Sequence, residues 1–425
     1  YYMKVGIIGS GGREHAICHA LNKSDIVKDV FCFPGNAGTA TIAKNIDLNL
    51  EDFDKLKDFI ISSKIDLIIV GPEKPLVNGI VDFLKDNNIK VFGPNKLASQ
   101  LEGSKIFTKK LCQKYNIPTA NFGIFTKSHE ANEFIKKSKY PLVIKADGLA
   151  SGKGVYICKT QGDALTAIKE IFDGKFGKAE NLLVEEFLEG EEMSYFVISD
   201  GNTIKNFETA QDHKQALEGD LGKNTGGMGA YSPSRLMNKE IEKKILDKII
   251  KPTIRGLKQA GINYVGFLYA GLMIVKNEPF LIEYNVRMGD PECQVILPKL
   301  ETDILNIFLA CCDGKLDELK IKWHDKKSLC IVLCARGYPD EYKKNILIEN
   351  LDKIKITNRE YIYHAGTINV ENKIYSIGGR VLNFVCLSEN FLDARIKILD
   401  TIKFLNWDNG FYRKDIGFKV IDKWE

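Results

Sequence analysis

The sequence predicts an α/β protein that begins with a parallel sheet covered by helices. Apolar strand-like runs alternate with helical patterns over the first hundred residues, and this βαβα order is typical of parallel sheets. Glycine- and proline-rich turns follow those runs, as expected where strands pass into helices. The chain has 425 residues, which is too long for one core and predicts about two to four domains.

The N-terminal elements follow from hydrophobic periodicity. We expect strands at Lys4–Gly9, Val30–Phe33, Ile65–Val70 and Val91–Phe92, and helices at Arg13–Leu21 and Val77–Leu84. The turns GSGG (9–12), PGNAG (34–38) and GPEKP (71–75) stand at the carboxyl ends of strands, where open parallel sheets bind ligands. Glu14 occupies the place of the third glycine of a dinucleotide fingerprint. A monophosphate on the following helix N-terminus therefore fits better than a dinucleotide.

Mixed α+β patterns follow from residue 104 onward. The first part predicts a helix at Lys105–Tyr115, and then strand, helix, hairpin, helix and strand between Asn121 and Gly190. Gly201–Pro233 reads as loop-rich. The next elements are a helix that Pro252 kinks or restarts, two paired strands and a further helix, at Glu240–Gln259, Val265–Val275, Pro279–Val286 and 302–312. From Ser328 onward, short strands before one helix indicate a compact α+β unit.

Composition excludes several functional classes. The chain has 60 basic and 56 acidic residues, a net charge of +4 and no basic block, so we expect no nucleic-acid partner. No apolar run approaches the roughly 20 residues that span a bilayer, and KVGIIG opens the chain in place of a signal peptide. The ten cysteines form no CxxC pair, which favours buried reduced thiols in a cytoplasmic protein. Tyr1 and Tyr2 precede Met3 and are expected to be an addition to the natural start.

The run LIEYNVRMGDPE (281–292) carries the strongest chemical signal. Alternate side chains of a strand share a face, so Glu283, Asn285 and Arg287 would point the same way. A carboxylate and an amide supply hard oxygen ligands for Mg²⁺ that also holds phosphate, and arginine suits a phosphate or acyl-phosphate oxygen. The alternative is an amphipathic strand with a solvated polar face. The rest of the chain favours the functional interpretation.

The segment IKADGLASGKGVYICK (144–159) predicts a hairpin with a glycine-rich tip. Its spacing differs from a P-loop, which would need glycine at Asp147 and a hydroxyl at Gly154. Such a tip can lay backbone N–H groups over phosphates, although a mobile polar hairpin fits the segment alone equally well. Lys145 interrupts an apolar strand, where lysine is disfavoured without a partner. A nucleotide phosphate would provide that partner.

Carboxylates and glycines mark further candidate segments. NLLVEEFLEGEE (181–192) is either a solvated charge run or a hinge whose backbone reads adenine and whose later glutamate holds ribose. QDHK (211–214) and NTGGMGAYSP (224–233) lie in the stretch read as loop. Glycines allow close backbone approach to an anion or small substrate, and long loops within compact domains are often functional. The six histidines show no metal-like spacing.

The motifs together resemble a known family. The chain carries, in order, GSGGREHA, PGNAGTA, IVGPEKPLVNGIVD, FGPNKLASQLEGSKIFTK, IKADGLASGKGV, VEEFLEGEEMS, QDHK, NTGGMGAYSP, GFLYAGLMI, IEYNVRMGDPE, HAGT and RKDIGFKVI. This series is similar to the phosphoribosylamine–glycine ligases, ATP-grasp enzymes of purine biosynthesis. The resemblance spans Met3–Glu425, and GSKIFTK, NTGGMGAYSP and NVRMGDPE are its most specific parts.

The resemblance implies three domains and one reaction. They are an N-terminal Rossmann-like parallel-sheet domain, a central ATP-grasp domain of two α+β lobes and a small C-terminal α+β domain, at 3–103, 104–327 (with the smaller nucleotide lobe at about 121–190) and 328–425. ATP, 5-phosphoribosylamine and glycine would give ADP, phosphate and glycinamide ribonucleotide through glycyl phosphate. Such chemistry rests on positioning and charge neutralisation, and it requires no nucleophile triad.

The resemblance also assigns roles to individual residues. Catalysis would use Lys145 and Arg287, and Mg²⁺ or Mn²⁺ would bind to Glu283 and Asn285. ATP would contact Lys105, Lys145, Gly152, Lys153, Gly154, Glu185, Glu186, Leu188 and Glu192. Glycine would be seated by Gly289, Asp290 and Pro291, next to Arg287. The phosphoribosylamine side would be lined by Asp212, Lys214, Gly226, Gly227, Met228 and Gly229, together with Gly11, Gly12, Arg13, Asn36 and Glu73.

One departure and several rival functions remain open at this stage. Many ATP-grasp relatives carry a further metal-binding carboxylate on the strand before Glu-x-Asn, whereas Tyr269–Leu272 contains no acid. One or two metal ions therefore remain open. Rivals are a carboxylase or another purine-pathway ligase, a nicotinamide-dependent dehydrogenase and a non-catalytic ATP-binding regulator. The expected partners are small substrates, with no nucleic acid or membrane. The lability of phosphoribosylamine in water favours a transient contact with the preceding enzyme of the pathway.

Overall fold

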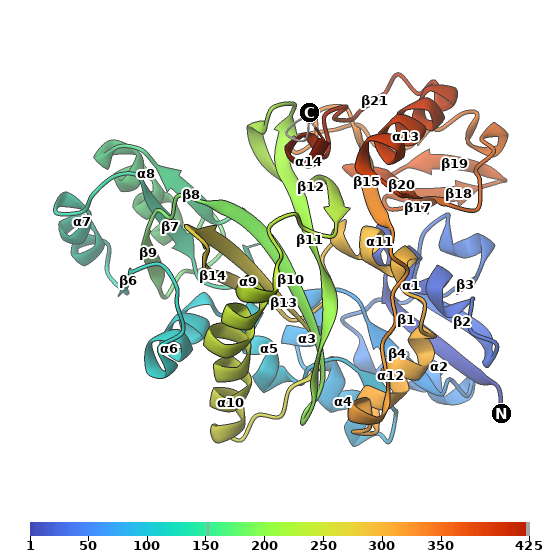
Figure 1. Cartoon of the computed structure of the whole chain (residues 1–425), viewed down its shortest axis with the longest axis horizontal. Helices are drawn as coiled ribbons and strands as arrows, with labels where there is room; N and C mark the ends of the chain where they lie inside the picture. The colour runs from blue at the N-terminus through green and yellow to red at the C-terminus, as the bar shows by residue number, and fades with distance from the viewer. Residues whose placement is uncertain (151–152, 422–425) are drawn as a thin grey trace.

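The computed structural model describes residues 1–150 and 153–421 of the chain (Figure 1). Its N-terminal part is a five-stranded parallel sheet in the order β3-β2-β1-β4-β5. The strands are β1 (Met3–Gly9), β2 (Val27–Pro34), β3 (Lys44–Asn45), β4 (Leu67–Val70) and β5 (Val91–Phe92). The helices are α1 (Gly12–Leu21), α2 (Phe53–Ser62), α3 (Glu73–Val77), α4 (Ile80–Asp86) and α5 (Lys96–Gly103). The predicted Rossmann-like α/β class is confirmed.

The helix expected at Val77–Leu84 is instead two helices. Gly79 separates α3 from α4 and has a φ of +89°, a left-handed conformation that suits glycine and interrupts a helix. The sequence reading also omitted β3, α2 and α5. Helix α5 is relevant to function because it carries Glu102, which contacts strand β14 (Glu278–Asn285) just past its end.

A smaller lobe contains a separate four-stranded sheet in the order β6-β9-β7-β8. Its elements are β6 (Phe122–Phe125), α7 (Ser128–Lys136), β7 (Leu142–Ala146), β8 (Val155–Cys158), α8 (Gln161–Phe172) and β9 (Leu182–Glu186). Ile144, Ile168 and Val184 belong to a core that is distinct from the two larger cores of the molecule. The strand–helix–hairpin–helix–strand order is as predicted, and the lobe extends to one side in Figure 1.

The main sheet has nine strands, with the path β14-β13-β10-β11-β12-β15-β20-β17 and β21 beside β15. The strands are β10 (Glu191–Asp200), β11 (Ile204–Leu217), β12 (Leu221–Ser232), β13 (Val265–Val275), β14, β15 (Lys327–Ala335), β17 (Glu360–His364), β20 (Arg380–Ser388) and β21 (Gly410–Phe411). Strand β12 pairs antiparallel with β15, from Gly229 opposite Ile331 to Ser232 opposite Ser328. One sheet therefore runs on into the C-terminal region.

The loop-rich interpretation of Gly201–Pro233 is wrong. This segment forms β11 and β12, which pair with each other as a long hairpin (Figure 1). The composition did not indicate strands, because β12 has glycines at positions where most strands have β-branched side chains. A Cβ atom on Gly229 would lie 2.6 Å from the carbonyl oxygen of Cys330. Glycine is therefore required for the close pairing of β12 with β15.

The remaining elements support the sheet and its loops. They are α6 (Lys105–Tyr115), α9 (Lys239–Ile245), a π-helical turn (Leu246–Ile250), α10 (Lys251–Gln259), α11 (Glu292–Ile296), α12 (Ile304–Cys312), β16 (Ile346–Leu347), β18 (Thr367–Val370), β19 (Lys373–Ser376), α13 (Phe391–Leu405) and α14 (Phe418–Ile421). As predicted, the long helical stretch restarts at Pro252, which lies in the first turn of α10. Among the described residues, no helix has the length and apolar character required to cross a membrane.

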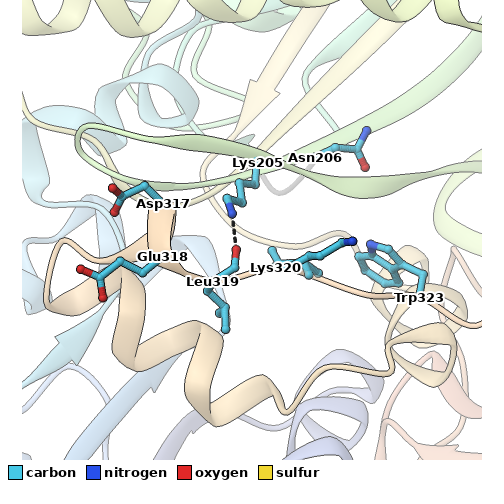
Figure 2. Close-up of a pocket in the computed structure, with 8 residues that line it drawn as sticks. Lys205, Asn206, Asp317, Glu318, Leu319, Lys320 and Trp323 are labelled. Carbon is cyan, nitrogen blue, oxygen red and sulfur yellow. Dashed lines mark hydrogen bonds between the residues drawn. The ribbon is translucent and has the colours of Figure 1, made fainter.

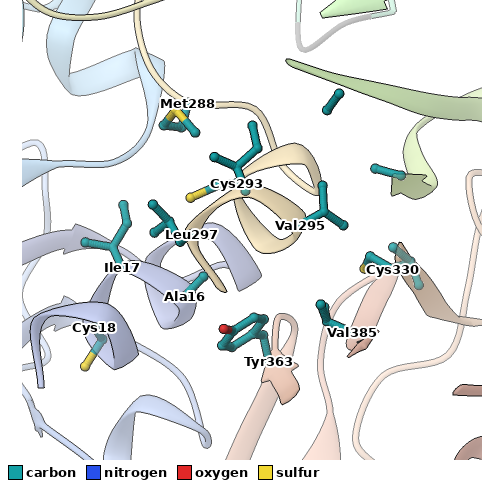
Figure 3. Packing of buried hydrophobic residues seen from close by; sticks show 14 of the residues in the cluster. Ala16, Ile17, Cys18, Met288, Cys293, Val295, Leu297, Cys330, Tyr363 and Val385 are labelled. Carbon is teal, nitrogen blue, oxygen red and sulfur yellow. The ribbon is translucent and has the colours of Figure 1, made fainter. Parts of the chain in front are cut away.

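Helix α11 lies at the centre of the molecule. Figure 3 shows Cys293 and Val295 of this helix between α1 and the strands of the C-terminal region. Both side chains are fully buried in one core that includes Ile17 and Val385. Residues 288–291 form the short loop before α11. The packing of α11 therefore holds this part of the predicted substrate site against the N-terminal, central and C-terminal regions of the chain.

Candidate active site

The predicted metal ligands lie on β14, and one of them, Glu283, lines a small pocket. Glu283 pairs with Gly271 of β13, and Asn285 pairs with Tyr269. The ladder is irregular at Gly271 and Leu272, next to Ile282, which also lines the pocket. Glu283 of β14 also lines it, and the other lining residues come from β10, β11 and β13 and are Glu192, Met193, Ser194, Asp212, Lys214, Tyr269, Gly271 and Leu272. Residues predicted from three separate motifs therefore meet at one pocket.

Charges in this pocket are strongly coupled. Lys214 Nζ lies 2.8 Å from Glu192 Oε2. The charge of Glu192, followed by that of Asp212, raises the pKa of the Lys214 ammonium well above its usual value, against the opposing effect of burial. Burial raises the pKa of Asp212. Glu192, predicted to hold ribose, is therefore paired with a residue predicted for the amine substrate.

Glu292 is a buried acid beside this pocket that the sequence interpretation did not assign. It is the first residue of α11 and is 3% exposed. Burial, followed by the charge of Asp212, raises the pKa of Glu292 to about 8. The hydroxyl of Tyr269 donates to Glu292 Oε1 at 3.4 Å and lies 2.8 Å from Ser194 Oγ. Gly289 makes room for this acid, because a Cβ there would lie 2.2 Å from Glu292 Oε2.

Two buried lysines share one carboxylate in the smaller lobe. Lys145 on β7 and Lys109 on α6 each place Nζ 3.3 Å from Oε1 of Glu185, and all three side chains are at most 5% exposed. Lys109 Nζ also donates to Thr119 Oγ1 at 2.6 Å. Lys145 was expected to need a partner in its apolar strand, and the carboxylate of Glu185 is that partner. Lys109 was not predicted, since the sequence gives no sign that a helical lysine faces inward.

Lys105 joins α6 to the glycine-rich hairpin. Its Nζ donates to the carbonyls of Ala146 and Gly148 at 3.0 and 2.7 Å, and burial lowers the pKa of its ammonium. Asp147 accepts from the backbone N–H of Lys105 at 2.8 Å. Thus Lys105 and Lys145 enter the same end of the lobe from α6 and β7.

Other predicted ATP contacts are placed around this hairpin and the hinge. Lys153 is exposed and Gly154 is buried. A Cβ on Gly154 would lie 2.9 Å from the Cβ atoms of Ala146 and Ala150. Glu186 is exposed and accepts from the backbone N–H of Asn121 at 2.9 Å, and Leu188 is half-buried in the connection to β10. The remaining predicted contact, Gly152, lies outside the described residues.

Arg287 follows β14 and contacts carboxylates from the N-terminal region. Its Nη2 donates to Glu102 Oε2 at 3.0 Å, and its Nε lies 3.3 Å from Glu73 Oε2. Nη1 donates to the carbonyl of Met288 at 3.3 Å, and Nη2 also reaches Asn285 Oδ1 at 3.4 Å. The structure thus brings predicted residues Arg287, Asn285 and Glu73 together and adds Glu102, which sequence reasoning missed.

The turn at residues 288–291 is held by the N-terminal and C-terminal regions. Arg13 donates from Nη1 to the Met288 carbonyl at 3.1 Å and from its backbone N–H to Asp290 Oδ2 at 3.4 Å. Arg380, another residue that was not predicted, donates from Nη1 to the carbonyls of Asp290 and Gly226 at 2.7 and 2.9 Å. The first turn of α1, expected to seat a monophosphate, therefore has a protein carboxylate beside it.

The glycines predicted for the amine substrate permit close contacts in the same region. A Cβ on Gly227, where φ is +129°, would lie 2.5 Å from the ring of Pro291, and Met228 is fully buried. A Cβ on Gly11 or Gly12 would approach Asp290 Oδ2 or Asn383 Nδ2 within 2.9 Å. Asn36 donates to the carbonyls of Ser10 and His364 at 2.9 and 2.8 Å, so it joins the N-terminal turn to β17.

The residues on β14 fit a magnesium ion that also binds phosphate. Glu283 and Asn285 provide carboxylate and amide oxygens, the hard donors that Mg²⁺ takes in small number while it keeps water or phosphate ligands. Over residues 1–150 and 153–421, there is no cluster of three or more His, Cys, Asp or Glu side chains arranged to hold a metal. Two protein oxygens leave the other coordination positions of such an ion to water or phosphate.

A second cavity, of about 490 Å³, lies away from the predicted residues. It is bordered by Lys205 and Asn206 of β11 and by residues 317–321 and Trp323. Figure 2 shows Lys205 reaching across it to the carbonyl of Leu319. None of the predicted site residues lines it.

Family models match nearly the whole chain. The three models are those of the phosphoribosylglycinamide synthetase N domain at residues 3–102, ATP-grasp (A) domain at 103–293 and C domain at 328–419. The phosphoribosylamine–glycine ligase of Brucella melitensis is 44% identical over 422 residues and 99% of each chain. That of Caldanaerobacter subterraneus is 45% identical over 420 residues, covering 97% of this chain and 99% of the relative.

Solved structures agree with these relatives. The crystal structure of the Thermotoga maritima phosphoribosylamine–glycine ligase has a TM-score of 0.86 at 34% identity and covers 98% of this chain and 100% of that one. The biotin carboxylase domain of the Hydrogenobacter thermophilus 2-oxoglutarate carboxylase, solved with MgADP and bicarbonate, has a TM-score of 0.72 at 17% identity, over 95% and 90% of the chains. The latter likeness shows the ATP-grasp fold alone. On the family models and the full-length relatives together, the chain belongs to the phosphoribosylamine–glycine ligases, ATP-dependent ligases of purine biosynthesis.

Proposed function

We propose that the pocket at β14 and the adjoining lobe form the centre at which glycine is activated by ATP and joined to 5-phosphoribosylamine. The observation that carries this assignment is the meeting of Glu192, Asp212, Lys214 and Glu283 at one pocket, with Arg287 at the end of the same strand. The domain division proposed for this centre is 3–103, 104–327 and 328–425, with the nucleotide lobe at about 121–190.

The smaller lobe is proposed to bind ATP. Lys105 and Lys145 would contact the phosphates, and the hairpin tip with Gly152, Lys153 and Gly154 would close over them. Lys145 is buried and Lys105 is half-buried, which supports this role because a desolvated ammonium interacts strongly with phosphate oxygen. Glu185, Glu186 and Leu188 would bind adenine, largely through backbone groups, and Glu192 would bind the ribose.

Mg²⁺ or Mn²⁺ is proposed at Glu283 and Asn285. When bound, the ion would neutralise phosphate charge during phosphoryl transfer. The residues themselves supply the fixed oxygen donors, and the pairing of β14 with β13 holds their backbone in place.

Two chemical steps are proposed, and both conserve atoms and charge. A carboxylate oxygen of glycine attacks the γ-phosphorus of ATP, the P–O bond to ADP breaks, and glycyl phosphate forms. The amine of phosphoribosylamine then attacks the acyl carbon, the bond to phosphate breaks, and the nitrogen loses a proton as the amide forms. Arg287 would stabilise the transferring phosphoryl group and the acyl phosphate, since its planar fork can hold two oxygens.

The substrates would lie on the two sides of the turn at residues 288–291. Gly289, Asp290 and Pro291 are proposed to seat glycine. Asp212, Lys214 and Gly226–Gly229 are proposed to line the phosphoribosylamine side, with Gly11, Gly12, Arg13, Asn36 and Glu73. We place the reaction in the cytoplasm, in keeping with ten free thiols. A transient contact with the preceding enzyme is proposed from the lability of the amine substrate.

The deciding experiment is a coupled assay of ADP release with Mg²⁺–ATP and freshly generated phosphoribosylamine, with and without glycine. ADP formation that requires both substrates supports the proposal. Stimulation by bicarbonate or formate in place of glycine would indicate the rival carboxylase or ligase. No ADP from folded protein in any mixture would overturn the proposal.

A further inference from the structure

Glu102 is a buried acid with no assigned role, and it contacts the end of the metal-binding strand. It lies near the C-terminus of α5, and its side chain is 7% exposed. One oxygen, Oε1, accepts from the backbone N–H of Val286 at 2.9 Å. The other, Oε2, accepts from Arg287 Nη2 at 3.0 Å. A single carboxylate thus binds both the backbone and the guanidinium of consecutive residues.

The two acids that face Arg287 hold it differently. Glu73 lies on α3, its side chain is 34% exposed, and its Oε2 is 3.3 Å from Arg287 Nε. Among the described residues, this Nε–H is buried and has no hydrogen bond of good geometry. Glu102 is more deeply buried, and its second oxygen is fixed to the strand backbone. The contact to Glu73 is therefore the one that a ligand oxygen can replace.

We propose that Glu102 is a positioning residue for the ligation reaction: it fixes the guanidinium of Arg287 while the Nε–H edge exchanges its contact with Glu73 for the reacting oxygens. This inference rests on the proposed role of Arg287. The geometry of the arginine then depends on a residue in a helix of the N-terminal region, 185 residues away in sequence. The planar guanidinium has one orientation once Nη2 is bound to Glu102 and Nη1 to the Met288 carbonyl.

Positioning of this kind acts on turnover more than on substrate binding. Glu102 has no hydrogen bond or ion pair to the described residues of the proposed ATP contacts, since its partners are Val286 and Arg287, so its loss should leave nucleotide affinity largely intact. A guanidinium that rotates by a small angle loses its alignment with the transferring group, and a misplacement near 1 Å can lower a rate about 100-fold. The expected signature is a fall in kcat with little change in the KM for ATP.

Glu102→Gln is the informative substitution. A glutamine can still accept from the Val286 N–H through its oxygen, but it presents N–H groups to Arg287 in place of an acceptor. We expect E102Q to lower kcat by about 10- to 100-fold, with the affinity for ATP, measured by calorimetry, close to that of the unchanged protein. If E102Q failed to fold, E102D would be judged by the same two measurements.

A matched control is Asp303→Asn. Asp303 also joins the N-terminal region to a helix of the ATP-grasp region, because Ser24 Oγ donates to its Oδ2 at 2.6 Å. It caps α12 through the Leu305 N–H at 2.9 Å, and asparagine caps helices equally well. D303N removes an interdomain charge away from the proposed reacting groups, so its kcat should be unchanged.

A double-substitution cycle shows whether Glu102 acts through Arg287. In an Arg287→Ala background, E102Q should cause no further loss of kcat, because the group it positions is absent. An additive loss, or wild-type kcat in E102Q, would overturn the inference. Normal turnover in R287A alone would instead remove the proposed role of Arg287, whereas impaired R287A with unimpaired E102Q would refute only the role of Glu102.

Discussion

The ammonium of Lys145 lies 3.3 Å from the buried carboxylate of Glu185. For Lys145 to bind an ATP phosphate, it must exchange some of this contact for the nucleotide. Leaving a buried carboxylate without a cation is strongly unfavourable. Lys109, which lies 3.3 Å from the same oxygen, is placed to remain with Glu185 during that exchange.

The first prediction is that Lys109→Met weakens ATP binding. Without Lys109, moving Lys145 to the nucleotide would leave Glu185 buried and unpaired, so we expect the Kd for ATP to rise about tenfold, or roughly 1.4 kcal/mol. Calorimetric titration with ATP measures this effect. Lys114→Met serves as the control, because Lys114 is exposed on the same helix. An unchanged Kd in K109M would show that Lys145 does not leave Glu185.

The second prediction concerns Glu283→Gln. Glutamine keeps the size of the side chain and the pairing of β14 but removes the charge that a divalent cation requires. Activity at saturating ATP should fall by about 100-fold or more, while thermal unfolding remains close to that of the unchanged protein. Titration of activity with Mg²⁺ and Mn²⁺ tests the assignment. Near-normal turnover would remove Glu283 from the metal site.

The third prediction concerns Arg287→Lys. Lysine keeps the positive charge but cannot contact Glu102, Met288 and a ligand oxygen with one planar group. We expect kcat to fall by at least about tenfold, and the Kd for ATP to change little. Steady-state kinetics and ATP titration separate the two quantities. A change confined to ATP affinity would mean that Arg287 binds nucleotide and does not act on the transferring group.

The fourth prediction is a loss of stability on mild acidification. Burial lowers the pKa of His15 well below its usual value and that of His364 to about 4. His15 Nδ1 must stay unprotonated to accept the backbone N–H of His364 at 2.7 Å. The unfolded chain therefore binds more protons than the native one as pH falls below about 6.5. The free energy of unfolding should decrease by up to about 1.4 kcal/mol per pH unit for each histidine.

Denaturant unfolding between about pH 6.5 and pH 5 measures this slope. His15→Asn keeps an acceptor for the His364 N–H without a titrating ring, so its slope should be smaller than that of the unchanged protein. His129→Asn is the comparison, since His129 is exposed. Equal slopes in all three proteins would contradict the prediction.

Elements marked by a clear local pattern were well predicted. The alternation in Pro279–Val286 predicted β14, which forms one residue earlier, at Glu278–Asn285. The apolar run at Val265–Val275 predicted β13 with its observed bounds. Local apolar periodicity is enough for such strands because one face must be buried. The same argument placed Glu283 and Asn285 on one strand.

Elements that depend on distant partners were not recognised. Strand β12 contains glycines that make sense only opposite β15, about a hundred residues later. Glu102 and Lys109 likewise look like ordinary polar residues of amphipathic helices, and only the packing of α5 against Arg287 and of α6 against Glu185 buries them. A single sequence contains no signal for such contacts, because they arise from tertiary packing.

The pairing of β12 with β15 has a mechanical consequence. Rotating the C-terminal region as a unit would break the hydrogen bonds from Gly229 to Ser232, whereas the lobe of β6 to β9 has its own sheet and its own core. That lobe can swing without loss of any strand pairing in the rest of the molecule. On the proposed assignment, ATP therefore binds to an arm with its own core, while the proposed glycine and amine sites belong to the frame whose sheet continues into the C-terminal region.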